Sequence, residues 1–514
     1  MVWNARRWCP LVVFVGVSVL VAGCTAPEPE FVDPLTAYRD PSERLNYRVE
    51  AAGQAWDAVE EGSADREGTR SALKSIIWSS SAPFELRQAG LAALLRDQDP
   101  EGVNDTKRVM GLMVMRERDE RMVAFISSQI AAKGWGELTP SLVRSWSRVL
   151  GEPGDSRPEP QAIAALHPGI PLDEVVFRVF LDPRVERGPY QIRWDERTRA
   201  DAWDLLSRLD PSGERRWSLI TGGDAAVAAA GGAEIVNHLR AAAVDLRCLP
   251  QTSEELRWLT SLRDPSDRLN AEWWRRVART LDGLTDEQRR GVQLRHAEPI
   301  RWASANRPEW LQRSRSDLAA ELDARLQERR RFRRQNFAVG GQRSSTERLE
   351  EALPAMVWAD LLAALVVDDA LQTRGLPASV FEYTELDRED RTTEYGGILE
   401  ATELGAEPFR IALYPPRASA RTSDEAFVAS EDMMNASDRA LAHFHLQVQR
   451  TQLRQFAGPS TGDLAYAARS GRLCVVFTSL DRDRLNVDYY QPDGVVLDLG
   501  VIERPEATEA ADAG

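Results

Sequence analysis

An apolar stripe at helical spacing recurs between about residue 43 and residue 335, and it restricts the fold of that region more than any other feature. From residue 86 to residue 94, apolar or small side chains occupy positions i, i+3, i+4, i+7 and i+8, which places one apolar face along a helix. The stripe returns at 142–150, 202–209 and 273–281. Because no such helix can bury its apolar face alone, the sequence predicts a stacked α-helical array.

Turn-forming sequences at 210–213 and 264–266 separate neighbouring helices of this region. The stretch from Phe84 to Leu95 is similar to the second helix of a HEAT repeat, and this resemblance implies a repeat array that docks a protein partner. A regular period is not found elsewhere in the sequence, so an irregular helical domain is the alternative. Under either interpretation, we expect the tryptophans of the region to lie in its core.

The sequence changes character near residue 340, because all 15 tryptophans lie at or before Trp358. Five arginines surround Phe332, and Gly340 and Gly341 follow. Such a charge run is typical of a solvated helix end, and the two glycines indicate a linker. We therefore place a linker at residues 336–348, between two domains of different construction.

Short β-rich runs follow this linker, at 394–400, 409–414, 440–446 and 473–478. An Asp-Gly turn after Gln491 predicts a hairpin, and helices are expected near 349–372 and after Asp463. These elements predict a compact α/β domain over residues 349–502. The acidic end of the chain, residues 503–514, is expected to be disordered. The expected fold class is thus α followed by α/β.

The first 24 residues have the layout of an export signal. Two arginines, Arg6 and Arg7, precede an apolar run from Leu11 to Ala22, which is too short to span a hydrocarbon core of about 30 Å. The sequence Val21-Ala22-Gly23-Cys24 resembles the lipobox of bacterial lipoproteins. The resemblance implies that residues 1–23 are a signal peptide and that Cys24 carries the lipid. The alternative is an ordinary secretory signal with a chance cysteine.

Residues 24–42 contain four prolines and no helical period, so an extended lipidated tether is expected there. The residue after Cys24 is Thr25, not the aspartate that favours inner-membrane retention in some bacteria. We therefore expect a protein anchored in the outer membrane and facing the periplasm or the cell surface. Cys248 and Cys474, the two cysteines beyond Cys24, are expected to be buried free thiols.

The formal net charge of −15 argues against nucleic acid as a partner. Broad contact with anionic lipid is disfavoured for the same reason, so membrane attachment is expected to come from the acyl group. The sequence contains no Gly-rich phosphate loop or dinucleotide fingerprint, and a nucleotide is not expected either.

Candidate metal ligands are found in the C-terminal domain. His443 and His445 lie two residues apart in a predicted strand, and residues so spaced face the same side. Asp463 follows, and Glu394 begins an earlier predicted strand. Two histidines and a carboxylate leave one position of a tetrahedral zinc ion for water, and a nearby glutamate can take a proton from that water.

The order of these residues resembles the JAMM or MPN-type zinc metalloproteases, whose pattern is Glu, then His-x-His, then Ser-x-x-Asp. This resemblance implies that His443, His445 and Asp463 bind zinc. It also implies that Glu394 is the general acid/base and that Ser460 stabilises the tetrahedral intermediate. The sequence departs from the pattern at two places. Fourteen residues separate His445 from Ser460, about twice the usual gap, and Leu446 replaces the proline that commonly follows the second histidine.

Simpler explanations exist for each motif taken alone. Ser460 and Asp463 also fit a helix capping box, and a His-x-His pair can lie on the polar face of a strand. The conjunction in one order favours a zinc-dependent hydrolase of peptide or isopeptide-type amide bonds. The alternative is a non-catalytic interaction lipoprotein in which the helical array is the docking surface.

Overall fold

A computed structural model describes residues 33–148, 157–183, 194–222, 233–328, 347–402, 407–421, 423, 427–450 and 457–505. The predicted signal peptide, Cys24 and residues 25–32 of the predicted tether lie outside these residues. None of the helices in the described ranges is long and apolar enough to cross a membrane. The chain divides into two compact units, and the first contains residues 33–113 and 117–126 of the described ranges.

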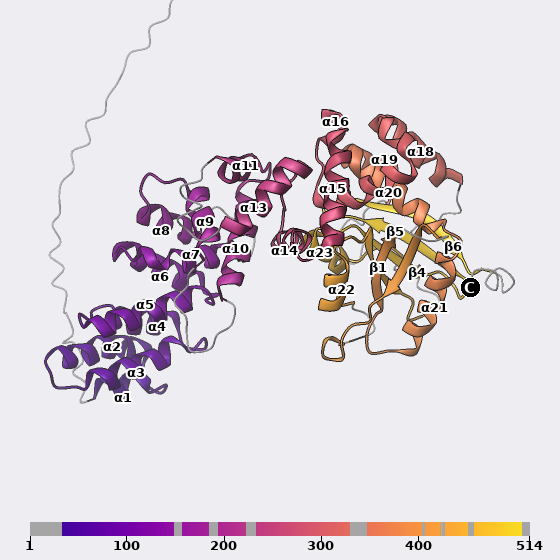
Figure 1. Cartoon of the computed structure of the whole chain (residues 1–514). Coiled ribbons are helices and arrows are strands. Elements are labelled where there is room, and N and C mark those ends of the chain that lie inside the picture. Colours follow the sequence, from indigo (N-terminus) through magenta and orange to yellow (C-terminus); the bar gives the residue numbers. More distant parts are fainter. Residues whose placement is uncertain are drawn as a thin grey trace, which may run out of the picture. The chain divides into compact units, whose positions relative to one another are not determined.

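The first unit consists of helices that pack through an apolar core (Figure 1). The predicted stripe at 86–94 forms the buried face of α4, as expected. The helices that lie wholly or largely in this unit are α1 (Pro34–Arg39), α2 (Leu45–Glu60), α3 (Arg66–Ile77), α4 (Phe84–Leu94), α5 (Pro100–Val114) and α6 (Glu120–Ala132).

Residues 34–39 form helix α1, although the sequence predicts them as part of an extended tether. The carboxylate of Asp33 accepts hydrogen bonds from Leu35 N and Thr36 N, and it thereby caps the helix. Tyr38 is fully buried, and its hydroxyl donates to Leu86 O at 3.4 Å. The prediction of an extended chain is therefore wrong for this segment, because a cap and one buried aromatic residue fix a helix too short to show a periodic stripe.

The second unit continues with further helices, and the predicted stripes at 202–209 and 273–281 fall on α10 and α15. Leu142 and Trp146 of the stripe predicted at 142–150 fall on α7, whereas residues 149 and 150 lie outside the described ranges. The turn predicted at 210–213 is present, with Gly213 in the left-handed region at φ +76°. The helices before the predicted linker are α7 (Thr139–Ser147), α8 (Pro158–Leu166), α9 (Leu172–Leu181), α10 (Trp194–Leu209), α11 (Glu214–Thr221), α13 (Ala233–Ala241), α14 (Ser253–Leu262), α15 (Arg268–Asp282), α16 (Asp286–Arg289), α17 (Ala297–Asn306) and α18 (Arg315–Glu328).

Helices α14 to α17 pack against elements that follow the predicted linker. Trp258 Nε1 donates to Asp438 O at 2.7 Å, and the ring of Trp302 lies 4.7 Å from that of Phe409. The linker predicted at 336–348 consequently falls inside the second unit, which runs from residue 127 to the C-terminus. Residues 329–346 lie outside the described ranges. The change in composition near residue 340 therefore does not coincide with the boundary between the two compact units. The reason is that elements after the predicted linker cover apolar faces of helices α14 to α17.

The C-terminal part contains a six-stranded mixed sheet with strand order β2-β1-β3-β4-β5-β6. Strands β3 and β4 are parallel, helix α23 lies in the connection between them, and all other neighbouring strands are antiparallel. The strands are β1 (Gly396–Ala401), β2 (Phe409–Leu413), β3 (Ala442–Gln447), β4 (Cys474–Ser479), β5 (Arg484–Tyr490) and β6 (Val496–Glu503).

Helices α22 and α23 pack on one face of this sheet (Figure 1). Met433 of α22 contacts Ile398 of β1, whereas Ala467 of α23 packs on β4 and β5. The helix predicted near 349–372 is interrupted by a short 3₁₀ turn at Leu353–Ala355, and α21 was not expected from the sequence. The helices of this part are α19 (Leu349–Ala352), α20 (Trp358–Leu371), α21 (Leu376–Glu389), α22 (Glu431–Ala436) and α23 (Thr461–Ser470).

The expected fold class is therefore confirmed at the level of an N-terminal helical array followed by a mixed sheet with flanking helices. Strand β6 extends to Glu503, the first residue of the predicted tail, and residues 506–514 lie outside the described ranges. Cys248 and Cys474 are buried free thiols, as predicted.

Candidate functional site

His443 and His445 lie on strand β3 in the middle of the sheet, and both side chains are buried, with 2% and 3% exposure. Their spacing of two residues places them on the same face. In the register of the neighbouring strand β1, Gly396 lies opposite His445. The ring of Phe427 stacks on His445 at 6.3 Å, and a Cβ at Gly396 would lie 2.7 Å from that phenyl ring. The glycine therefore makes room for the aromatic ring that covers the histidine.

Of the two ring nitrogens of His443, one has a hydrogen-bond partner among the described residues and the other has none. Its Nδ1 lies 2.8 Å from the hydroxyl of Tyr466, while its buried Nε2 has no hydrogen-bond partner in the described structure. Burial, reinforced by the charge of Arg472, holds the pKa of His443 well below its ordinary value. The ring is therefore neutral near pH 7, which is the form of histidine that binds a metal ion.

His445 is arranged in the same way but carries a carboxylate neighbour. Its Nδ1 lies 3.4 Å from the hydroxyl of Tyr490, and its Nε2 lies 3.3 Å from Asp463 Oδ1, without the alignment of a hydrogen bond. Burial, the largest single influence, lowers the pKa of His445, but its interactions with Asp463, Glu394 and Asp387 together outweigh burial and raise the pKa above the ordinary value. Burial likewise raises the pKa of Asp463, but His445 and the hydrogen bonds with Ser460 together outweigh it and bring the value down to about 2. The carboxyl of Asp463 is thus ionised throughout the physiological range.

Asp463 has two functions at once in this arrangement. Its Oδ2 accepts a hydrogen bond from Ser460 N at 2.7 Å, and its backbone N donates to Ser460 Oγ at 3.2 Å. These two bonds form the capping box at the start of α23, so the simpler explanation of the Ser-x-x-Asp motif is confirmed. The cap occupies Oδ2, whereas Oδ1 faces His445. A helix cap and a metal ligand are therefore compatible at this residue.

Glu394 lies just before β1 and is 7% exposed. Its Oε1 accepts a hydrogen bond from Gln449 Nε2 at 2.8 Å. Glu394, Ser460, Asp463 and both histidines line one cavity of about 250 Å³. The structure thus brings all five predicted site residues of this domain to a single cavity, and the sixth, Cys24, lies outside the described residues.

The donor atoms around this cavity suit a zinc ion in their chemistry. Two buried Nε2 atoms lack partners, and ligands about 2.1 Å from a tetrahedral zinc are about 3.4 Å apart, close to the 3.3 Å between His445 Nε2 and Asp463 Oδ1. These side chains are not yet close enough together to form a complete metal site. Within the described ranges, no three or more His, Cys, Asp or Glu side chains are gathered closely enough to hold a metal ion.

Three contributors to the site were not predicted from the sequence. Tyr466 follows Asp463 by three residues and so lies on the same face of α23, a spacing that could have revealed it. Tyr490 reaches His445 through the pairing of β4 with β5, which no local pattern indicates. Asp387 of α21 accepts a hydrogen bond from Tyr395 N through Oδ1 at 2.5 Å, and its buried Oδ2 has no partner among the described residues.

Burial raises the pKa of Asp387 to about 8, even though the hydrogen bond from Tyr395 N lowers it, and the neighbouring charge of Glu394 raises it further. Near neutral pH this carboxyl is therefore largely protonated, close enough to Glu394 for the charge of that carboxylate to raise its pKa.

Comparison with known proteins does not assign the chain to a family. No protein-family model, curated protein or solved structure matches it. The chemistry of this site therefore has to be inferred from its own side chains.

Proposed function

We propose that this protein is a zinc-dependent hydrolase of peptide or isopeptide-type amide bonds, which acts at the cavity lined by His443 and His445. The observation that supports this most is the buried Nε2 of His443, which has no hydrogen-bond partner in the described part of the chain, together with the Nε2 of His445, which lies 3.3 Å from Asp463 Oδ1 without the alignment of a hydrogen bond. An unsatisfied buried polar atom costs roughly 1–3 kcal/mol, so such a nitrogen beside a cavity favours a compensating ligand. A metal ion shared by both imidazoles is such a ligand.

His443 Nε2, His445 Nε2 and Asp463 Oδ1 would hold the ion. A zinc ion there supplies an acidified water and polarises a carbonyl oxygen of the substrate. The hydroxyls of Tyr466 and Tyr490 contact the opposite nitrogen, Nδ1, of each ring and so fix its orientation.

Glu394 is proposed as the general base and then the general acid of the reaction. Gln449 holds its Oε1 at 2.8 Å, which fixes the carboxylate at the wall of the cavity. Ser460 Oγ accepts a bond from Asp463 N, so the hydroxyl proton remains available for donation to a developing oxyanion.

The strongest competing candidate is a non-catalytic interaction protein. It is favoured by the capping box, which accounts for Ser460 and Asp463 without any metal, and by the lack of three gathered metal-binding side chains among the described residues. In that case the two histidines are core residues, and the helices supply the docking surface.

The two candidates differ in the effect of a matched pair of substitutions. Asp463→Asn keeps an oxygen that can accept the bond from Ser460 N, so the cap and the stability are retained, but zinc affinity falls by at least about tenfold as the anionic ligand is lost. Ser460→Ala removes half of the cap and costs about 1 kcal/mol of stability, while zinc binding persists. Zinc titration and urea unfolding of both variants measure these effects. A natural chain that binds no zinc would favour the interaction protein, and a zinc affinity unchanged in Asp463→Asn would exclude Asp463 as a ligand.

Hydrolysis tests the proposed activity directly. The full chain, purified in detergent, is incubated with a quenched-fluorescent peptide library and with solubilised peptidoglycan. We expect cleavage of one of them, loss of cleavage after treatment with a chelator, and recovery on addition of zinc. A protein that binds one zinc ion but cleaves neither probe would contradict a hydrolase of this class and leave a zinc-bound interaction protein.

We also propose that Cys24 anchors the protein in a membrane through a lipid, on the basis of the Val21-Ala22-Gly23-Cys24 sequence. Cys24→Ser removes the sulfur that accepts the lipid, so the precursor is expected to stay uncut and unlipidated. Labelling with a fatty-acid probe, followed by gel electrophoresis, measures both steps. A Cys24→Ser protein that still takes up the probe and migrates at the mature size would contradict lipidation at this residue.

A further inference from the structure

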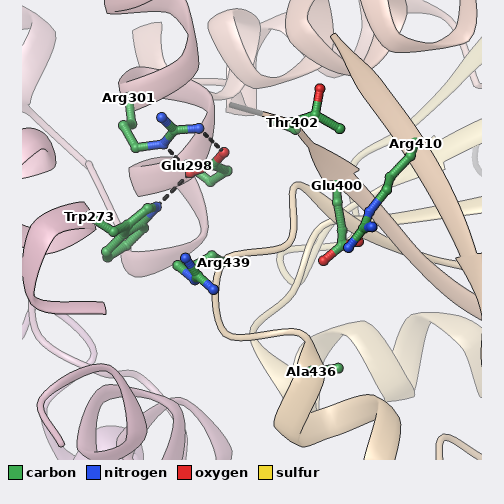
Figure 2. Close-up of a pocket in the computed structure, with 9 residues that line it drawn as sticks. Trp273, Glu298, Arg301, Glu400, Thr402, Arg410, Ala436 and Arg439 are labelled. Atoms are coloured by element: carbon green, nitrogen blue, oxygen red, sulfur yellow. Dashed lines mark hydrogen bonds and ion pairs between the residues drawn. The ribbon is translucent and has the colours of Figure 1, made fainter. Parts of the chain in front are cut away.

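A second cavity, of about 330 Å³, lies within the second unit at the end of β1 that is remote from Gly396 (Figure 2). Helices α15 and α17 contribute Trp273, Glu298 and Arg301, whereas β1 and β2 contribute Glu400 and Arg410. Arg439, in the segment between α22 and β3, completes the charged lining. None of these residues belongs to the histidine cavity.

The two glutamates of this cavity are already neutralised. Glu298 accepts from Trp273 Nε1 at 2.6 Å and from Nε and Nη2 of Arg301, each at 2.7 Å. Glu400 forms an ion pair with Arg410 at 2.6 Å. Each of these two carboxylates thus has a guanidinium as a partner.

Arg439 differs from the other two arginines, because it has no hydrogen-bond or ion-pair partner in the described structure. Figure 2 shows its guanidinium close to Trp273 and Glu298, across the cavity from Glu400 and Arg410. The side chain is partly buried. A guanidinium at the wall of a cavity, without a partner among the described residues, has N–H donors free to bind an anion.

Buried side chains of β1 and α22 fill the space between the two cavities. Ile398 of β1, two residues before Glu400, is fully buried, as is Met433 of α22, which packs against it. A ligand in the second cavity therefore cannot extend along the sheet face to His443. Its occupant is a molecule other than the substrate proposed above.

We propose that this second cavity binds a small anion of the carboxylate or phosphate class, with Arg439 as its principal contact. The planar fork of an arginine matches the two oxygens of either group. Arg301 and Arg410 are each engaged by a glutamate, which leaves Arg439 as the principal cationic contact.

Calorimetric titration of the zinc-free full chain with inorganic phosphate and with succinate, at constant ionic strength, tests the proposal. We expect saturable binding of at least one probe, and the stronger of the two identifies the anion class. Arg439→Met is expected to weaken that binding at least about tenfold, since a charge-assisted hydrogen bond is lost. Arg391→Met removes an exposed arginine outside the cavity and serves as the charge-matched control, with unchanged binding expected.

Glu400→Gln gives a second and opposite expectation. Removing this carboxylate takes a negative charge from the cavity and releases Arg410, so the anion should bind several-fold more tightly. If Arg439→Met fails to fold, the anion affinities of Glu400→Gln and Arg439→Lys test the proposal instead. Arg439→Lys is expected to bind the anion more weakly than the natural chain, but still measurably. The proposal is overturned if neither probe binds, or if Arg439→Met and Glu400→Gln both bind as the natural chain does.

Discussion

Glu394→Gln is expected to keep the zinc ion and to lose hydrolysis by about 10²- to 10⁴-fold, because an amide cannot take the proton of the attacking water. Its Oε1 accepts a bond from Gln449 Nε2, and the glutamine oxygen can accept the same bond, so the cavity should keep its shape. Initial rates of chelator-sensitive hydrolysis and the zinc content of the same samples measure the two effects.

Glu382→Gln supplies the control for this experiment, because it changes an exposed glutamate on α21 that does not line the cavity. We expect natural activity and natural zinc content in this variant. If Glu394→Gln hydrolysed its substrate as fast as the control, Glu394 would not be the general base, and the role that the motif order implies would be wrong.

Asp387→Asn is expected to stabilise the zinc-free protein by about 5 kcal/mol at pH 7.5 and to leave it unchanged below about pH 4. The folded pKa of Asp387 is raised to about 8, from the ordinary 3.8, so folding retains a proton that the unfolded chain releases. Its contribution to stability is therefore fully present below pH 3.8 and is lost as the pH rises to about 8. The asparagine side chain does not titrate, and its oxygen can still accept the bond from Tyr395 N.

Urea unfolding at pH 4 and at pH 7.5 measures this difference, followed by a probe of the sheet so that the two compact units are not confused. Glu382→Gln again serves as the control, as it removes an exposed carboxyl on the same helix. An Asp387→Asn protein that is less stable than the natural chain at pH 7.5 would show that the ionised carboxyl is stabilising, contrary to the burial of its unpartnered Oδ2.

The parts of the fold that could be predicted from the sequence are those with a local period. Trp273, Val277 and Leu281 repeat at helical spacing, and they form the buried face of α15. Helix α21 was missed, because its buried positions include Thr384 and Asp387, which interrupt an apolar stripe. Asp387, which interrupts the apolar stripe of α21, is also the residue whose pKa is raised to about 8.

The residues of the candidate site also fall into two groups: those that a local sequence pattern predicts and those that depend on contacts between distant segments. The shared face of His443 and His445 follows from strand geometry, and the capping role of Asp463 follows from its spacing to Ser460. The contact of Tyr490 with His445 depends on strands paired across the sheet. Composition placed the domain boundary near residue 340, whereas contacts such as that of Trp258 with Asp438 join the later helices to the sheet.

The zinc content of the full chain tests the account most directly. The protein is purified without chelator, and zinc is measured by mass spectrometry in the natural chain and in His443→Ala and His445→Ala. We expect about one zinc ion per natural chain and loss of tight binding in both variants, because two remaining protein ligands rarely hold the ion in an open site. A correctly folded natural chain that binds no zinc, or variants that bind as much as the natural chain, would contradict a metal centre at these histidines.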